Sequence, residues 1–174
     1  PDILSPEDTL TVYFNTLKKM NLEEMSSYLG VVDIMNTSDS VKNSIAEALV
    51  EQVHKNFNFK IKTSSVNGYN ATVTTEITTF DSNAILSDYQ HSLDDYLASP
   101  DSVINGSQKR YDKSLDLLLK SIESNTASAT SDVDFVLIND GTSWKLQDEG
   151  RTLGDAIFGT LTTSPLDDSS DSES

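Results

Sequence analysis

The sequence contains no cysteine. Disulfide bonds, zinc–thiolate sites and thiol nucleophiles are therefore excluded, whereas export is not, because many exported domains fold without disulfides. The sequence also lacks a run of about 18 apolar residues, the length that predicts a membrane-spanning helix. What remains is a chain of 174 residues, which is long enough for one domain with a hydrophobic core.

Basic side chains are scarce, since 12 Lys and Arg stand against 28 Asp and Glu and give a net charge of −16. This charge disfavours DNA, RNA and anionic membrane surfaces as partners, because affinity for polyanions rests on Lys and Arg. We interpret the acidic excess as a solubilising surface. The chain begins at Pro1 without an initiator methionine or a signal peptide. We therefore expect a mature or trimmed form from which a leader or lipid anchor has been removed.

Two segments of alternating polarity, residues 59–66 and 69–80, flank Asn67-Gly68. Alternation with a period of two predicts β-strands, and the Asn-Gly dipeptide tolerates the positive φ angles of a tight turn. Residues 132–138 and 143–147 repeat the pattern around a second turn. We therefore predict two antiparallel hairpins, all four strands of which belong to one sheet.

Three helices are predicted before the first hairpin. Ser5 precedes a proline and two acidic residues, which is typical of a helix start. Asn21 is expected to cap a second, short helix that ends at Gly30, and a third helix is expected over residues 40–56.

Helical spacing returns between the hairpins. Residues 82–123 predict an excursion of two amphipathic helices, the first of which ends near Pro100. Residues 124–131 lack an apolar period and predict a mobile loop. A last short helix or strap is expected over residues 153–161. The acidic, serine-rich residues 162–174 predict a disordered tail.

Three stretches carry a resemblance to a known family: PEDTLTVYFNTLKKMNLEEMSSYL, SSVNGYNATVTTEITTFD, and DGTSWKLQDE followed by LGDAIFG. Together they span most of residues 5–161, and the chain resembles the nuclear transport factor 2-like (cystatin-like) domains. More narrowly, it is similar to the exported lipoproteins of Gram-positive bacteria that carry this domain. The helical excursion departs from the minimal layout of the family.

The resemblance implies an α+β fold in which N-terminal helices cover a cone-like curved antiparallel sheet of about four strands. Residues 1–161 would form a single domain, with the helical excursion at residues 82–123 between the two hairpins. The sheet and the first helix would enclose a pocket. Such a scaffold serves enzymes, binding modules and assembly domains alike, so the fold alone assigns no activity.

Titratable side chains supply two weak candidates for chemistry. His91 shares a predicted helix face with Asp88 and Asp95, but a surface histidine with charged neighbours at i,i+3 and i,i+4 is the simpler interpretation. The other histidine, His54, lies near a predicted helix end. Hard oxygen ligands for calcium are offered by Asp132, Asp134 and Asp140, yet the spacing does not match the twelve-residue calcium loop. We predict no catalytic residues, no metal site and no cofactor.

Aromatic side chains are the more informative group. Five of them fall on elements that would face the concave side of the cone, and most are expected to be core: Tyr13, Phe14, Tyr28, Phe135 and Trp144. Tyrosine and tryptophan also carry a polar end that suits a partly wet pocket. The predicted ligand-binding residues are Tyr13, Phe14, Tyr28 and Trp144.

The pattern as a whole favours an exported, surface-tethered binding module of the Gram-positive envelope that does not transform its ligand. The ligand would be a small molecule, a peptide or an envelope protein. Two other classes stay open. One is a small lyase, isomerase or hydrolase that uses the cone pocket, and the other is a dimerisation or adaptor domain. The protein would be a monomer or a homodimer.

Overall fold

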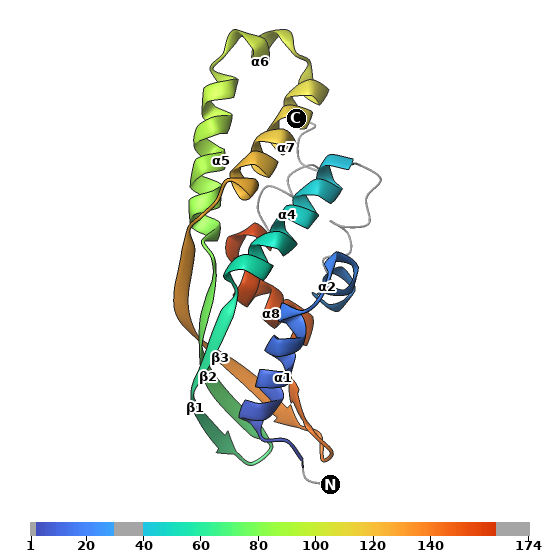
Figure 1. The fold of residues 1–174 in the computed structure, drawn as a ribbon, viewed down its shortest axis with the longest axis vertical. Helices are drawn as coiled ribbons and strands as arrows, with labels where there is room; N and C mark the ends of the chain where they lie inside the picture. The colour runs from blue at the N-terminus through green and yellow to red at the C-terminus, as the bar shows by residue number, and fades with distance from the viewer. Residues whose placement is uncertain (1–2, 30–39, 163–174) are drawn as a thin grey trace.

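The computed structural model describes residues 3–29 and 40–162. The protein is an elongated α+β molecule in which one antiparallel sheet lies at one end and a pair of long helices extends to the other (Figure 1). Helices near both termini pack against the sheet between these ends. The predicted fold class is confirmed.

The sheet has four strands in the order β1-β2-β3-β4. Its strands are β1 (Asn58–Asn67), β2 (Asn70–Phe80), β3 (Ser128–Asn139) and β4 (Trp144–Leu146). Every neighbouring pair is antiparallel. Both predicted hairpins and their membership of one sheet are therefore confirmed, and β2 joins the hairpins by pairing with β3.

The turn of the first hairpin differs from the prediction by one residue. Asn67 is still paired, with Asn70, so the turn consists of Gly68 and Tyr69 instead of Asn67 and Gly68. Gly68 has a φ of 66°, whereas Tyr69 is not among the residues with positive φ. A turn with glycine first and only one positive φ is of the II′ kind, while the predicted turn would have required two positive φ angles.

A β-bulge in β1 keeps its apolar side chains on one face. The register shifts between Ile61 and Thr63, so that Ile61 lies opposite Thr75 whereas Ser64 lies opposite Val73. An extra residue in one strand reverses the alternation beyond it. Without the bulge, Phe59 and Val66 would lie on opposite faces of the strand, because they are seven positions apart. With the bulge, both lie on the same face.

The third strand begins earlier than predicted. Residues 124–131 were expected to form a loop, but Ser128–Asn139 is continuous β3, and Ser128 lies opposite Phe80. This segment is small and polar, so it shows no local strand signal. Backbone hydrogen bonds to β2, which is remote in the sequence, supply the order that the local pattern does not predict.

The N-terminal helices form where the capping signals place them. Helix α1 (Pro6–Lys18) begins at Ser5, whose Oγ accepts a hydrogen bond from the backbone N–H of Asp8 at 3.0 Å. Helix α2 (Leu22–Leu29) begins with a reciprocal pair, since Asn21 and Glu24 each accept the backbone N–H of the other. Helix α4 (Ser40–Asn56) matches the third predicted helix. The predicted end at Gly30 lies outside the described residues.

The excursion between β2 and β3 forms a helical arm. It consists of α5 (Ser82–Leu97), the short α6 (Pro100–Ile104) and α7 (Ser107–Glu123), with α6 at its far end (Figure 1). Helix α7 packs on α4 and α5. The two long helices were predicted and α6 was not, because Pro100 was taken as a helix end although proline also suits the first position of a helix.

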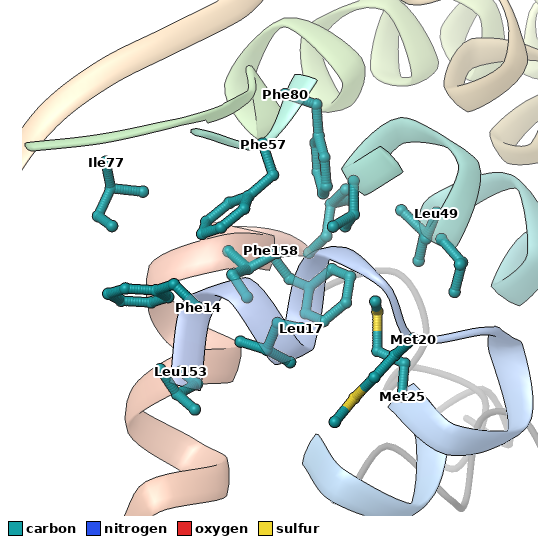
Figure 2. Close-up of a cluster of buried hydrophobic side chains, with 14 of the residues drawn as sticks. Phe14, Leu17, Met20, Met25, Leu49, Phe57, Ile77, Phe80, Leu153 and Phe158 are labelled. Carbon is teal, nitrogen blue, oxygen red and sulfur yellow. The ribbon is translucent and has the colours of Figure 1, made fainter. Parts of the chain in front are cut away.

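The C-terminal part closes the core with α8 (Glu149–Phe158) and the 3₁₀ helix η1 (Gly159–Thr162). Figure 2 shows side chains of α1, α4, β2 and α8 meeting in one cluster, with Phe14, Leu17, Phe80 and Phe158 among them. Leu161 in η1 is buried. Beyond Thr162, the predicted disordered tail lies outside the described residues.

Candidate functional site

Phe14 lies at the centre of a cluster of aromatic rings on the packed face of the sheet. It is fully buried, and the centroid of its ring lies 5.6 Å from that of Phe57, 5.1 Å from that of Phe59 and 5.3 Å from that of Phe135. Aromatic pairs at such distances attract one another beyond their burial alone. Four rings from α1, β1, β3 and the residue before β1 thus pack together between α1 and the sheet.

Trp144 points to the same side of β4 as Leu146, as predicted. The exposed fraction is 9% for Trp144 and 4% for Leu146, whereas Lys145 between them is exposed. The predicted orientation of the indole is therefore confirmed. The indole is part of the hydrophobic core cluster.

Tyr13 is the half-buried member of the predicted ligand-binding set. Burial raises the pKa of its hydroxyl, and a hydrogen bond to the nearby negative Glu149 raises this pKa further, while a hydrogen bond with the backbone of Leu146 opposes the shift. A tyrosine with a raised pKa is protonated at neutral pH, so the Tyr13 hydroxyl can donate a hydrogen bond.

The fourth predicted residue, Tyr28, belongs to α2, but its side chain lies outside the described part of the structure. The structure therefore brings Tyr13 and Trp144 to the β4–α8 end of the sheet and places Phe14 in the core beneath them. The ligand-binding role of the four residues stays a prediction.

Among the described residues, open depressions occur on the helical side of the molecule. One, of about 330 Å³, lies between α1 and α2 and is lined by Val12, Asn15, Thr16, Lys19, Met20 and Glu24. The other, of about 460 Å³, lies between α5 and the end of α7 and is lined by Asp88, Ser92, Leu117, Lys120, Ser121, Glu123 and Ser124. Neither depression includes a residue of the predicted ligand-binding set.

The histidines lie apart from each other. His91 is exposed on α5, and its Nε2 lies 3.9 Å from a carboxylate oxygen of Asp95, which confirms the surface interpretation. The Nε2 of His54 lies 2.7 Å from the backbone oxygen of Met20, so this ring ties the end of α4 to the end of α1.

The acidic residues considered for calcium have other partners. Lys62 donates to Asp132 at 2.9 Å, and the Thr74 hydroxyl donates to Asp134 at 2.6 Å, both on the outer face of the sheet. Asp140 accepts hydrogen bonds within its own turn. Within residues 3–29 and 40–162, no group of three or more His, Asp or Glu side chains could hold a metal ion.

The far end of the helical arm carries an apolar surface that the sequence analysis missed. Val103 is 80% exposed, Ile104 is 79% exposed and Leu97 is 48% exposed. We call these three residues the arm tip. The signal that could have found it is the aliphatic pair Val103-Ile104 in a short segment between Pro100 and Gly106, where no core can be reached.

Comparison with protein-family models and with curated proteins gives no match to this sequence. Among solved structures, the fold is similar to that of a candidate lipoprotein, ycdA, from Bacillus subtilis subsp. subtilis strain 168, with a TM-score of 0.50 and 16% sequence identity. The similarity covers 88% of this chain and 47% of that protein, so this chain spans about half of its length. The likeness concerns the fold: this chain has an α+β architecture like that of a candidate lipoprotein.

Proposed function

We propose that this chain is the folded domain of an exported, surface-tethered protein of the Gram-positive envelope that binds a partner without transforming it. Two observations support the cellular place in this proposal: the sequence resemblance to nuclear transport factor 2-like domains of exported lipoproteins and the similarity in fold to the candidate lipoprotein ycdA. No helix among residues 3–29 and 40–162 is long and apolar enough to cross a membrane.

The observation that carries the proposal is the packing of Phe14. Small-molecule sites are concave and largely preformed, whereas Phe14 and the three rings around it pack against one another on the core face of this sheet. A ligand at this point would have to displace buried aromatic side chains. In our proposal the partner is therefore a peptide or an envelope protein that meets the outer surface of the domain.

The predicted ligand-binding residues differ in how far a partner could reach them. Tyr13 is the described member that a partner reaches without unpacking the core, because it is half-buried and carries a protonated hydroxyl beside Glu149. Phe14 and Trp144 are buried in the hydrophobic core, so a partner would not contact them directly.

A thermal-shift experiment tests the proposal. Envelope extract from the cells that make the protein is separated into dialysable and non-dialysable parts, and each part is added to the purified protein. Binding to the native state raises the melting temperature by mass action. We expect a saturable rise with the non-dialysable part and a smaller rise for Tyr13→Ala.

Other results would contradict the proposal in distinct ways. A rise with the dialysable part alone would favour a small ligand, and chemical change of that ligand would favour the enzyme alternative. A rise with protein concentration alone, together with a doubled mass in light scattering, would favour the dimerisation alternative. Finding the protein in the cytosolic fraction would contradict its cellular place.

A further inference from the structure

We infer that the arm tip is a docking point for a protein partner that presents an apolar pocket rimmed by Lys or Arg side chains. This inference rests on the proposed function and adds a second contact surface, separate from the one at Tyr13, together with the chemistry of the partner that fits it. Val103 and Ile104 belong to α6 and Leu97 is the last residue of α5. Helix α6 lies at the end of the molecule farthest from the sheet (Figure 1). Among the described residues, Val103 and Ile104 are the most exposed large apolar side chains.

The backbone that presents the arm tip is held in place by polar side chains. The Ser102 hydroxyl, whose residue is 3% exposed, donates to the backbone oxygens of Leu97 and Ser99, each at 2.9 Å. Arg110 Nη1 donates to the backbone oxygens of Ser102 at 2.8 Å and Asn105 at 2.6 Å.

A second contact closes the same turn from the other side. Asn105 Nδ2 donates to the Tyr96 hydroxyl at 3.0 Å, and Lys113 Nζ lies 6.0 Å from the centroid of the Tyr96 ring. The turn is thus tied to both α5 and α7. A surface that is ordered before binding loses less conformational entropy on association, which favours tight binding.

The aliphatic side chains of the arm tip do not contribute to the hydrophobic core. Neither Val103 nor Ile104 belongs to the hydrophobic core cluster or packs against it. Solvent-exposed apolar groups on a projecting, ordered element are typical of contact sites, because they stabilise a complex only when a partner removes them from water.

Charge indicates the kind of partner. Three exposed carboxylates lie beside the arm tip, on Asp94, Asp95 and Asp101. Two nearby cations, Arg110 and Lys113, are engaged with the turn itself, while Lys109 at the start of α7 is exposed and leaves the three carboxylates in excess. The net charge of the whole chain is −16. A second copy of this chain and an anionic bilayer would both be repelled, whereas a Lys- or Arg-rimmed pocket would be attracted.

Photo-cross-linking in the cells that make the protein tests this inference. Val103 is replaced by p-benzoylphenylalanine in one variant, and Val66, which is 55% exposed at the other end of the molecule, is replaced in the control. We expect one protein adduct at position 103 and none at position 66. Mass spectrometry should find Lys or Arg beside the cross-linked residue, and the pair Asp94→Lys and Asp101→Lys should abolish the adduct.

The captured partner is then purified for a binding measurement. Val103→Asp with Ile104→Asp should weaken its affinity at least about tenfold, and the melting temperature should not change because both side chains are exposed. The inference is overturned if position 103 yields no adduct, a lipid adduct or a second copy of this chain. An adduct at position 66 alone would overturn this inference and leave the proposed function standing, whereas a cytosolic protein with no adduct at either position would remove both.

Discussion

Gln52 and Asn125 hold each other through two hydrogen bonds across 73 positions of sequence. Gln52 Nε2 donates to the backbone oxygen of Asn125 at 3.2 Å, and Asn125 Nδ2 donates to Gln52 Oε1 at 3.0 Å. Gln52 Nε2 also donates to the backbone oxygen of Ile122 at 3.0 Å. A buried side chain of α4 therefore ties down the end of α7, where the helical arm returns to the sheet.

Replacing Gln52 should loosen the base of the arm. Gln52→Leu removes the side-chain hydrogen bonds to the backbone oxygens of Ile122 and Asn125 and the acceptor of the Asn125 amide, so we expect a loss of about 2–3 kcal/mol in the free energy of unfolding, measured by urea denaturation. Gln90→Leu is the control, because Gln90 is exposed and bonds only to Asp94 at 3.1 Å. Equal losses in both variants would contradict the role of Gln52.

Valine substitutions at two threonines of β2 should change the free energy of unfolding in opposite directions. Thr75 is fully buried, and its hydroxyl finds no hydrogen-bond partner in the described structure. Thr75→Val should therefore raise the free energy of unfolding by about 1 kcal/mol, since an unpaired buried hydroxyl carries a desolvation cost. Thr79 donates to the backbone oxygen of Ile157 at 2.8 Å, so Thr79→Val should lower it by about 1 kcal/mol. Calorimetry of the two proteins checks the signs, and a destabilised Thr75→Val would show that its hydroxyl is satisfied by water.

Alanine substitutions at Gly159 and Gly154 should change the free energy of unfolding in opposite directions. Gly159 has a φ of 57°, and a Cβ there would lie 2.5 Å from Ser82 Oγ. Gly159→Ala should cost about 2–4 kcal/mol through strain and crowding. Gly154 lies inside α8 with open space around its Cβ position.

Gly154→Ala is the matched control for Gly159→Ala. It should raise the free energy of unfolding by about 0.5–1 kcal/mol, because alanine favours a helix over glycine. Thermal unfolding of both variants measures the difference. If Gly159→Ala proved as stable as the parent protein, the close approach of η1 to α5 would be wrong.

Asp140 should make stability depend on pH. Its carboxylate accepts hydrogen bonds from the backbone N–H of Thr142 (2.9 Å), from the Thr142 hydroxyl (2.8 Å) and from the backbone N–H of Ser143 (3.0 Å). Lys145 Nζ lies 3.2 Å from it. These contacts, the Thr142 hydrogen bonds first, hold the pKa of Asp140 well below its usual range.

A lowered pKa in the folded state stabilises the protein above the pKa of an unfolded Asp, about 3.9, and this stabilisation is lost as the pH falls below that value. Asp140→Asn should therefore lower the melting temperature at neutral pH, and its difference from the parent protein should shrink under more acidic conditions. Asp116→Asn, on the exposed face of α7, controls for the loss of one negative charge. A difference that stays constant with pH would contradict the role of the charge.

Trp144 should contribute mainly to stability. Only 9% of the Trp144 surface is exposed. Trp144→Ala should therefore lower the free energy of unfolding, measured by chemical denaturation, by about 3–5 kcal/mol. Gln147→Ala, at an exposed position just beyond β4, should change little. Unaltered stability of Trp144→Ala would refute its place in the core.

Much of the fold follows from local patterns. Ser5 before Pro6 predicts the start of α1, and its side-chain cap is present. The alternation in β2 predicts its buried face, where Val73 and Ile77 lie toward the core. The same argument predicts the orientation of Trp144. Each of these features depends on neighbours within a few positions, which the sequence displays directly.

The features that only the tertiary structure revealed depend on contacts between residues that are distant in the sequence. Order at Ser128 comes from pairing with Phe80, and the bulge near Thr63 comes from the register that packing imposes on β1. The aromatic packing between α1 and the sheet comes from three rings that surround Phe14 and belong to segments distant from it in the sequence. The exposure of Val103 reflects the length of the arm, because an apolar residue is buried only where another element reaches it. Local patterns in the sequence determined the elements and their inward faces, while long-range packing decided that the interior is filled and that the arm tip faces solvent.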